Sequence, residues 1–398
     1  MSPSSISRRD FVAQMAVAAG AGLVGCKDAT APGPTPDPTT PSIDHVIFVT
    51  MENRSFDHLL GWLPGADGKQ AGLSYVDMNG VAQSTHRITD FQECGSNDPN
   101  HSYEGGRAEY NAGACDGWLK TPGNDLYSIG YYQATELPFI GQAAPMWRVC
   151  DRYFCPIMAP TFPNRVISLA GQTDRLSNTL VASTLPTIWD RLSAAGLTGR
   201  NYGDSVVSST LWGLKYNSII KTIPTFHAEA AAGTLPNVAF VDPDFTDDFS
   251  DSYHPPGDIR NGEAFLSRIY KSVTTGPLWK SSLLIITFDE WGGFYDHVPP
   301  PVSPVPQGEK DIGHTDGLRG FRIPTILISP FVKRASVTSK VYDHTSVLKL
   351  IETRWNLPSL TVRDAGANNL MDEIDLTIPV AAAPVIDVAA GPYGSPCT

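Results

Sequence analysis

The chain has 398 residues, of which 41% are hydrophobic and 18% are charged. This composition is that of a globular protein and excludes an intrinsically disordered chain. The net charge of −12 argues against nucleic acid as a partner, because phosphate binding needs a basic surface, and it also disfavours simple electrostatic adhesion to anionic lipid. The length is enough for one large α/β domain or two smaller ones.

The first residues resemble an export signal. Ser7 to Phe11 form a twin-arginine pattern, and the apolar run at residues 12–24 is too short and too weakly hydrophobic to span a bilayer. The run leads into Cys26 through a sequence typical of the cleavage and lipidation box of bacterial lipoproteins. We therefore predict a twin-arginine signal peptide at residues 1–25, a lipid anchor on Cys26 and a periplasmic or cell-surface location.

Six cysteines suit an exported chain, because disulfides form and persist outside the cytoplasm. If Cys26 is acylated, neighbours along the chain can pair as Cys94 with Cys115 and as Cys150 with Cys155. These pairs remain open, because sequence alone does not determine connectivity. No CxxC spacing is present, which argues against a zinc–thiolate site.

Strand and helix patterns alternate along the rest of the chain. Continuous apolar runs typical of buried parallel strands occupy residues 45–51, 237–241, 283–288 and 325–329. Helical patterns occupy residues 164–170, 185–195, 262–273 and 345–354. The alternation predicts an α/β fold, a three-layer sandwich in which helices flank a mostly parallel central sheet.

The composition also divides the chain into parts. Residues 26–43 are Pro-rich and predict an extended tether, residues 44–380 form the folded domain, and residues 381–398 form a C-terminal tail. Within the domain, residues 61–150 are rich in Gly, Asn, Asp and aromatic residues. They predict a loop-rich cap or insertion near the functional site.

The most informative feature is the pair Asp289 and Glu290, directly after a buried strand. In an open α/β sheet the ligand site lies outside the carboxyl ends of the strands, and two adjacent carboxylates there need a cation or a shared proton. The first strand ends in a similar way, in Glu52 and Asn53. These oxygen ligands predict one divalent metal ion, Mg²⁺, Ca²⁺ or Mn²⁺ without excluding Zn²⁺. A solvated turn and a helix cap are the alternatives.

A hydroxyl group is held at the start of a predicted helix. Pro160 and Pro163 flank Thr161 and restrict the backbone around it. Free N–H groups and the helix dipole favour an anion at such a position, and a neighbouring metal ion would activate the hydroxyl as a nucleophile. The alternative is that Thr161 or Asn164 only caps the helix.

Four histidines are further candidates. His101 and His254 lie in loop-like sequence and can bind phosphoryl oxygens or protonate a leaving alkoxide near neutral pH. His297 follows the acid pair by a few residues and is expected to orient it. His344 opens a helix, where capping is the favoured role.

Together these motifs resemble the bacterial phosphoesterase family that contains the non-haemolytic phospholipases C and a group of acid phosphatases, within the alkaline phosphatase superfamily. The resemblance extends from about His45 to Trp355. It rests on separate blocks in a fixed order, at Glu52–His58, Asn100–Ser102, Pro160–Arg165, His254–Glu263, Asp289–His297 and Asp343–Ser346. It implies an alkaline-phosphatase-like version of the three-layer fold.

The resemblance also implies roles for individual residues. The residues that match the family's metal ligands are Glu52, Asn53, Asp289 and Glu290. Thr161 matches the Ser/Thr nucleophile, and His101 and His254 match histidines around the bound phosphate. The residues expected to bind or orient the substrate are Asn164, Arg165 and His297. Two features depart from the family pattern: Trp291 stands where many members carry His, and the C-terminal extension of many of the phospholipases is absent. The resemblance therefore does not decide whether the substrate is a phosphomonoester or a phosphodiester.

The resulting prediction is an exported, metal-dependent hydrolase of phosphoric esters that acts through a phospho-threonine intermediate. Its expected partners are one divalent metal ion, a phosphate ester such as a phospholipid headgroup, and the membrane that holds the lipid anchor. The alternative is a surface lipoprotein with a decayed phosphoesterase fold that binds a ligand without catalysis. The oligomeric state, like the identity of the metal, is left undetermined.

Overall fold

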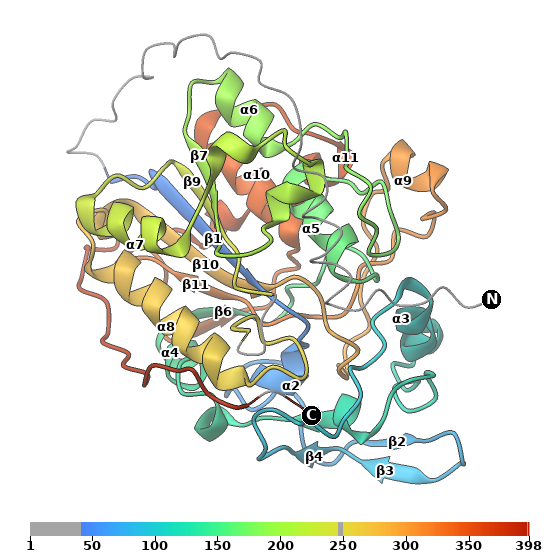
Figure 1. Ribbon diagram of the computed structural model, residues 1–398. Helices are drawn as coiled ribbons and strands as arrows, with labels where there is room; N and C mark the ends of the chain where they lie inside the picture. The colour runs from blue at the N-terminus through green and yellow to red at the C-terminus, as the bar shows by residue number, and fades with distance from the viewer. Residues whose placement is uncertain (1–40, 246–249, 396, 398) are drawn as a thin grey trace.

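The computed structural model describes residues 41–245, 250–395 and 397, and an eight-stranded sheet runs through its centre (Figure 1). In spatial order the strands are β12 (Ser336–Thr338), β6 (Arg148–Cys150), β11 (Ile326–Ile328), β10 (Ser282–Phe288), β1 (His45–Met51), β9 (Val238–Val241), β7 (Gly199–Tyr202) and β8 (Ile220–Lys221). The signal peptide, Cys26 and most of the tether lie outside the described residues.

The sheet is mostly parallel, as predicted, with one exception. β1 pairs in parallel with β10 on one side and with β9 on the other. β11 runs antiparallel to both of its neighbours, β10 and β6, so the prediction of a parallel strand at residues 325–329 is wrong. A continuous apolar run indicates a strand that is buried on both faces. A buried antiparallel strand shows the same run as a buried parallel one, so the run does not predict strand direction.

Helices cover both faces of the sheet and confirm the three-layer architecture (Figure 1). α7 (Ile223–Ala232) and α8 (Ile259–Thr275) lie on one side. The other side is covered by α5 (Thr161–Ala170), α6 (Ile188–Ala194), α10 (His344–Trp355) and α11 (Val362–Ala365). Every residue of β10 is buried, and so is all of β1 after its first residue. Each large apolar side chain buried there contributes about 1.5–3 kcal/mol.

α5, α8 and α10 begin earlier than the apolar patterns indicate, whereas α6 begins at Ile188, three residues after the predicted residue 185. α8 starts at Ile259, three residues before the predicted residue 262, because the Asp258 carboxylate accepts a hydrogen bond from the Arg260 backbone N–H. Asp343 caps α10 in the same way by accepting from the Thr345 N–H. These caps satisfy N–H groups that the first helical turn leaves unpaired, and they come before any apolar periodicity.

The region at residues 61–150 is rich in loops. It contains two small sheets, β2 (Ser74–Val76) with β3 (Ala82–Ser84) and β4 (His86–Arg87) with β5 (Gly130–Tyr131). Its helices are α3 (Tyr103–Tyr110) and α4 (Ile140–Met146). The last residues of the range form β6 of the main sheet. Two other short helices are α2 (Phe56–Leu60), after β1, and α9 (Gln307–Asp311).

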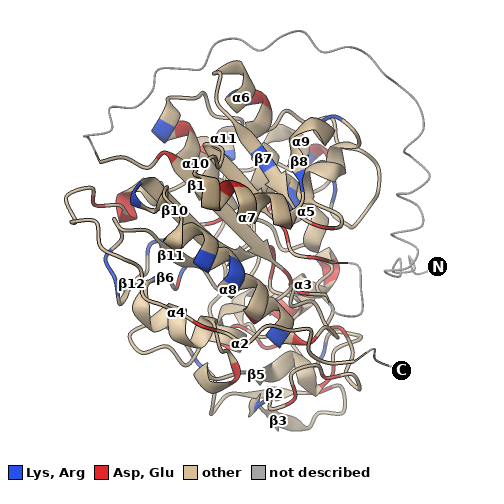
Figure 2. Ribbon diagram, turned by 60° about the vertical axis from the view of Figure 1, so that its left-hand side comes forward, with Lys and Arg blue, Asp and Glu red and all other residues tan. Residues whose placement is uncertain are grey.

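Charged residues lie around the central strands. β1 and β10 contain no Lys, Arg, Asp or Glu, and Figure 2 shows the charges on the surrounding helices and loops. Among the described residues, no helix has the length and apolar character needed to cross a membrane. The acids that follow β1 and β10 therefore come directly after uncharged, buried backbone.

The cysteine pairing differs from the predicted one. Cys94 is bonded to Cys397, 303 residues further along the chain, and Cys115, Cys150 and Cys155 are free and buried. The predicted pairs were chosen for closeness in sequence. The C-terminal tail instead returns across the domain to the loop that contains Cys94, which only the tertiary structure reveals.

Candidate active site

The carboxyl ends of β1 and β10 bring the predicted metal ligands together. Met51 is opposite Phe288 in the parallel ladder, so Glu52 and Asn53 leave β1 beside Asp289 and Glu290, which leave β10. All four side chains are buried: Glu52 is 6% exposed and the other three are 0% exposed. The Asp289 N–H donates to the Met51 carbonyl oxygen at 2.9 Å, which continues the pairing one residue beyond the strands.

Backbone hydrogen bonds hold this cluster in place. The Asn53 N–H and the Glu290 N–H donate to Asp289 Oδ1 at 3.1 and 2.7 Å. The Gly292 N–H donates to Glu290 Oε2 at 2.6 Å. Gly292 has a φ of 65°, and a Cβ there would lie 2.2 Å from the Asn53 carbonyl oxygen, so only glycine fits this turn.

The electrostatics of the cluster call for a cation. Burial raises the pKa of Asp289 and, together with the charge of Asp289, raises the pKa of Glu290 well above its usual value. Two oxygens in the cluster, Asn53 Oδ1 and Glu290 Oε1, are buried without a hydrogen-bond partner among the described residues. A buried acceptor without a partner costs free energy, and a hard divalent cation would satisfy both oxygens. These residues therefore fit the predicted metal ion.

Arg165 connects the acid pair to the next helix. Its Nε donates to Asp289 Oδ2 at 3.1 Å and its Nη1 to Asp242 Oδ1 at 2.6 Å, with all three side chains buried. The guanidinium also donates to Ser208 Oγ at 3.2 Å. These contacts show that Arg165 holds Asp289, a predicted metal ligand, in position.

Thr161 is the first residue of α5, with Pro160 as its N-cap. It is four residues before Arg165, so both side chains lie on the same face of α5, the face that contacts Asp289. Asn164 Nδ2 donates to the carbonyl oxygens of Ala159 and Pro160 at 2.7 and 3.1 Å. Asn164 thus fixes the turn that presents Thr161, and its amide group is engaged with backbone.

The structure also brings His101 and His254 together, with ring centroids 6.2 Å apart. The Nδ1–H of each donates to a backbone carbonyl oxygen, that of Pro99 at 2.7 Å and that of Pro255 at 2.5 Å. His101 Nε2 accepts from Asn53 Nδ2 at 3.3 Å and lies 3.9 Å from Glu290 Oε1. His101 therefore lies beside the predicted metal ligands Asn53 and Glu290, and His254 lies beside His101.

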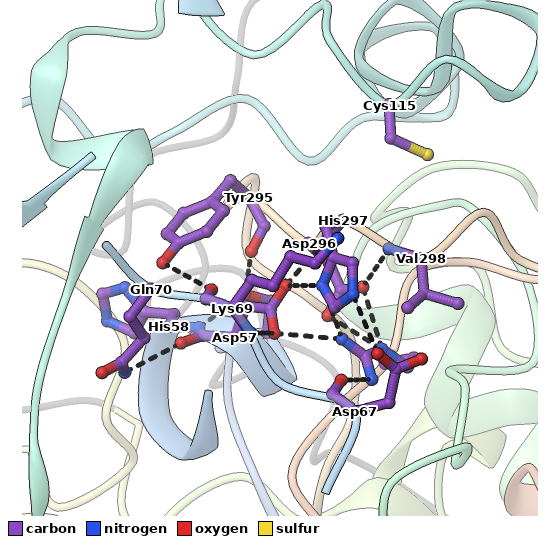
Figure 3. A network of polar contacts seen from close by, with 12 residues as sticks. Asp57, His58, Asp67, Lys69, Gln70, Cys115, Tyr295, Asp296, His297 and Val298 are labelled. Carbon is purple, nitrogen blue, oxygen red and sulfur yellow. Dashed lines mark hydrogen bonds and ion pairs between the residues drawn. The ribbon is translucent and has the colours of Figure 1, made fainter. Parts of the chain in front are cut away.

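His297 lies elsewhere, and the prediction that it orients the acid pair is wrong. Its Nδ1 donates to Asp57 Oδ2 at 2.5 Å and its Nε2 to Asp67 Oδ1 at 3.1 Å (Figure 3). Burial alone would lower the pKa of His297, but the hydrogen bond and charge of Asp57 outweigh it and raise the pKa. The chain turns back at Gly292 and Gly293, both with positive φ, and leads His297 to α2.

A buried arginine completes the network around His297. Arg322 donates to Asp57 Oδ1 at 3.0 Å and to Asp296 Oδ1 at 2.9 Å, and these three side chains are 0% exposed. The two carboxylates and the guanidinium compensate one another's burial. This network anchors the far end of the loop that begins at Asp289.

We expect Arg322→Leu to lower the free energy of unfolding by about 3–5 kcal/mol, because it leaves two buried carboxylates without their cation. Urea denaturation at neutral pH measures this loss. Arg152→Ala is the control: it removes the exposed ion pair with Asp67 (2.7 Å) and should cost less than about 1 kcal/mol. Equal losses in the two variants would contradict a specific role of the buried network.

Trp291, the residue after the acid pair, has a packing role. Its indole N–H donates to Glu109 Oε2 at 2.8 Å, and its ring lies 5.6 Å from that of Phe321. A Cβ on Gly106 of α3 would approach the indole within 2.7 Å. Burial raises the pKa of Glu109 to about 8, although hydrogen bonds from Asn124 and Trp291 partly oppose the shift.

This shift predicts a pH-dependent stability. Folded Glu109 keeps its proton up to about pH 8, whereas the unfolded chain releases it near pH 4.5. The unfolded state therefore binds fewer protons in this window, and stability falls as the pH rises. Between pH 5 and pH 8 the wild type should lose about 2–5 kcal/mol relative to Glu109→Gln, measured by urea denaturation. Glu104→Gln, an exposed change on the same helix, should follow the wild type; parallel profiles for all three proteins would contradict the prediction.

Two further residues of the site, Asp242 and Asp98, were not predicted from the sequence, and a third, His344, was expected only to open a helix. Asp242 follows β9, so an acid directly after a buried strand was the available signal. Asp98 lies with Oδ2 3.6 Å from His254 Nε2, a pairing that no local pattern indicates. His344 Nε2 donates to the Asp289 carbonyl oxygen at 3.1 Å, a role beyond the start of a helix. Burial lowers the pKa of His344 to about 4, so this imidazole is neutral.

Comparison with known proteins identifies the family. The model of the Phosphoesterase family matches residues 43–358. The chain belongs to this family. Non-specific phospholipase C6 of Arabidopsis thaliana is 30% identical to it, over 86% of this chain and 74% of that protein. Phospholipase C B of Mycobacterium tuberculosis is 29% identical, over 94% of this chain and 86% of that protein.

Solved structures are more distant. A protein of the alkaline phosphatase superfamily from Vibrio parahaemolyticus is similar over 85% of this chain and 76% of its own, with a TM-score of 0.39 and 9% identity. The family membership makes this protein a hydrolase of phosphoric esters.

Proposed function

We propose that this protein is an exported, metal-dependent phosphoric ester hydrolase of the phospholipase C or acid phosphatase type, which acts through a phospho-threonine intermediate. The observation that carries the proposal is the buried oxygen cluster at the ends of β1 and β10, with two acceptors that lack partners. Thr161 begins the helix that Arg165 ties to this cluster.

The metal ligands in this proposal are Glu52, Asn53, Asp289 and Glu290. A bound divalent cation would supply positive charge that lowers the pKa of a nearby hydroxyl and stabilises a phosphoryl group. Thr161 would then release its hydroxyl proton to solvent and attack phosphorus: its oxygen forms a bond to phosphorus as the bond to the leaving alcohol breaks. At the start of α5 the Phe162 N–H donates to Asn178 Oδ1 at 2.8 Å and Pro163 has no N–H, so the Thr161 N–H is the backbone donor that this helix would offer to a phosphoryl oxygen.

The two histidines provide proton transfer and phosphate contacts. Because Nδ1 of each ring donates to a backbone carbonyl oxygen, Nε2 is the nitrogen of His101 and His254 that would exchange a proton with the substrate. In the imidazolium form, Nε2 donates a proton to the leaving alkoxide. Water then attacks phosphorus, the bond to the Thr161 oxygen breaks, and the hydroxyl regains a proton.

The proposed substrate is based on the relatives, and the proposed location is based on the N-terminal sequence. The named relatives are phospholipases C, which favours a phospholipid headgroup ester as the substrate, and small phosphomonoesters are the second class to test. The twin-arginine pattern and Cys26 support export and a lipid anchor, which would place the enzyme beside membrane lipid.

A substrate panel tests the proposal. Purified protein would be assayed with p-nitrophenyl phosphate, p-nitrophenyl phosphorylcholine and phosphatidylcholine vesicles, before and after chelation and with Mg²⁺, Ca²⁺, Mn²⁺ or Zn²⁺ restored. We expect hydrolysis of at least one ester, loss on chelation and recovery with a metal ion. A protein that binds no metal and cleaves no ester would instead support the decayed fold.

A further inference from the structure

His101 and His254 both lie in loops. Contacts with other segments of the chain must therefore hold these loops in place. His101 lies between Cys94 and the start of α3, and His254 lies before α8. Neither histidine is in a helix or strand of the described chain. Loops without ladder hydrogen bonds are the segments that open most easily, and a displacement of about 1 Å in a catalytic group can cost roughly 100-fold in rate.

The C-terminal tail runs along α8 towards these loops. Tyr270 donates its hydroxyl hydrogen to the Pro384 carbonyl oxygen at 2.6 Å. Nearer the start of α8, Asn261 Nδ2 donates to the Tyr393 carbonyl oxygen at 3.1 Å, and the Tyr393 N–H donates to Asn261 Oδ1 at 2.7 Å. In Figure 1 the red C-terminal segment follows α8.

The end of the tail is bonded to one of these loops and lies close to the other. Cys397 forms the disulfide with Cys94, four residues before Asp98. The Cys397 sulfur lies 3.9 Å from the Pro256 carbonyl oxygen, two residues after His254. The disulfide therefore stands between the segment that leads to His101 and the segment that contains His254.

Further contacts join the same three segments. Gln92 Nε2 donates to the Ser395 carbonyl oxygen at 2.5 Å, and the Ser395 N–H donates to Gln92 Oε1 at 3.2 Å. The guanidinium of Arg260 lies 4.5 Å from the Phe91 ring centroid and 4.8 Å from that of Tyr393. Each stacked pair contributes about 0.5–1 kcal/mol at such a site, and the disulfide is the covalent link in this attachment.

We infer that the Cys94–Cys397 disulfide is a positioning element, which holds the loops at residues 94–101 and 253–258 so that both histidines reach the phosphoryl group, and that ester hydrolysis depends on its oxidised state. The inference rests on the proposed function of His101 and His254. The end of the C-terminal tail would then help to position the loops of the active site. Activity would also be sensitive to the thiol–disulfide balance of the surroundings.

The other described cysteines do not share this sensitivity. Cys115, Cys150 and Cys155 are buried, and burial raises the pKa of all three thiols, that of Cys115 to about 12. Thiolate is the form that reacts, so these cysteines are inert at neutral pH. Dithiothreitol breaks the Cys94–Cys397 bond by supplying two electrons and two protons, yielding two thiols and its own cyclic disulfide.

The experiment compares oxidised wild type, dithiothreitol-reduced wild type and the double variant Cys94→Ser/Cys397→Ser on the ester that the wild type cleaves best. We expect kcat/KM to fall at least tenfold in both disulfide-free forms, with bound metal unchanged, and to recover when the reduced wild type is reoxidised with glutathione disulfide. Tyr270→Phe is the matched control: it removes a tail hydrogen bond far from the loops and should keep full kcat/KM.

Hydrogen–deuterium exchange gives a second readout that does not depend on the substrate. Faster exchange at residues 94–101 and 253–258 in the disulfide-free forms, with little change in the sheet, supports the inference. A lower melting temperature with unchanged kcat/KM and unchanged loop exchange would overturn it, because the disulfide would then be only a stabilising link. If the wild type cleaves no ester, the proposed function fails, and loop exchange alone decides whether the disulfide positions the loops.

Discussion

Thr161→Ala should lower kcat for ester hydrolysis by about 10³-fold or more, because it removes the oxygen that forms the covalent bond to phosphorus. Thr161→Val, which keeps the shape of the side chain but lacks the hydroxyl, should lose as much. Thr161→Ser keeps a hydroxyl at the start of α5, and its kcat should remain within about tenfold of the wild-type value. The nucleophile is then still a hydroxyl group, and only its geometry changes slightly.

Steady-state rates with p-nitrophenyl phosphate and p-nitrophenyl phosphorylcholine measure this effect. Acid quenching during turnover, followed by mass spectrometry of the peptide that contains Thr161, should detect an added phosphoryl group in the wild type only. Bound metal should be the same in wild type and all three variants. Activity that survives in both Thr161→Ala and Thr161→Val would rule out the threonine mechanism.

Glu290→Gln should strongly weaken metal binding, and activity should fall with it. The change keeps the size of the side chain and removes one charge from a cluster whose oxygen Glu290 Oε1 lacks a protein partner. A divalent cation then loses an anionic ligand, which we expect to reduce affinity by about 10- to 100-fold or more. Metal content after dialysis and titration with Mg²⁺, Ca²⁺, Mn²⁺ and Zn²⁺ measure the change.

Stability provides an independent check on the same variant. Without metal, folded wild type carries a buried acid whose pKa is raised well above its usual value, mainly by burial and then by the charge of Asp289. Glu290→Gln removes that cost at neutral pH, so the metal-free variant should be at least as stable as the metal-free wild type. Asp289→Asn instead breaks the pair with Arg165 and should destabilise the fold. A stable Glu290→Gln protein with unchanged metal affinity would exclude Glu290 as a ligand.

Much of the architecture could be predicted because burial leaves a direct mark on sequence. The apolar runs at β1, β9 and β10 predicted buried strands, and the acids after β1 and β10 predicted a site at the sheet edge. The short strands β7 and β12 were missed, since three or four residues are too few to show a period. The direction of β11 was also wrong, because an apolar run does not record strand direction.

Side-chain partners were harder to predict than strands. His297 is seven residues after Glu290, yet it bonds Asp57 and Asp67, because two glycine turns redirect the loop. Cys94 was paired with a neighbour in sequence but bonds Cys397. In both cases the partner comes from a distant part of the chain, and closeness in sequence is a poor guide when the chain folds back through turns.

The amino-acid sequence by itself determined the fold class, the oxygen-rich strand ends and the position of Thr161 at the start of a helix, because strand burial and helix starts are local properties that each leave a local pattern. Only the tertiary structure decided that Arg165 holds Asp289 through an ion pair shared with Asp242, and that the tail closes on the loops of His101 and His254. These are contacts between segments far apart along the chain. Their geometry follows from how the whole domain packs, which no local pattern encodes.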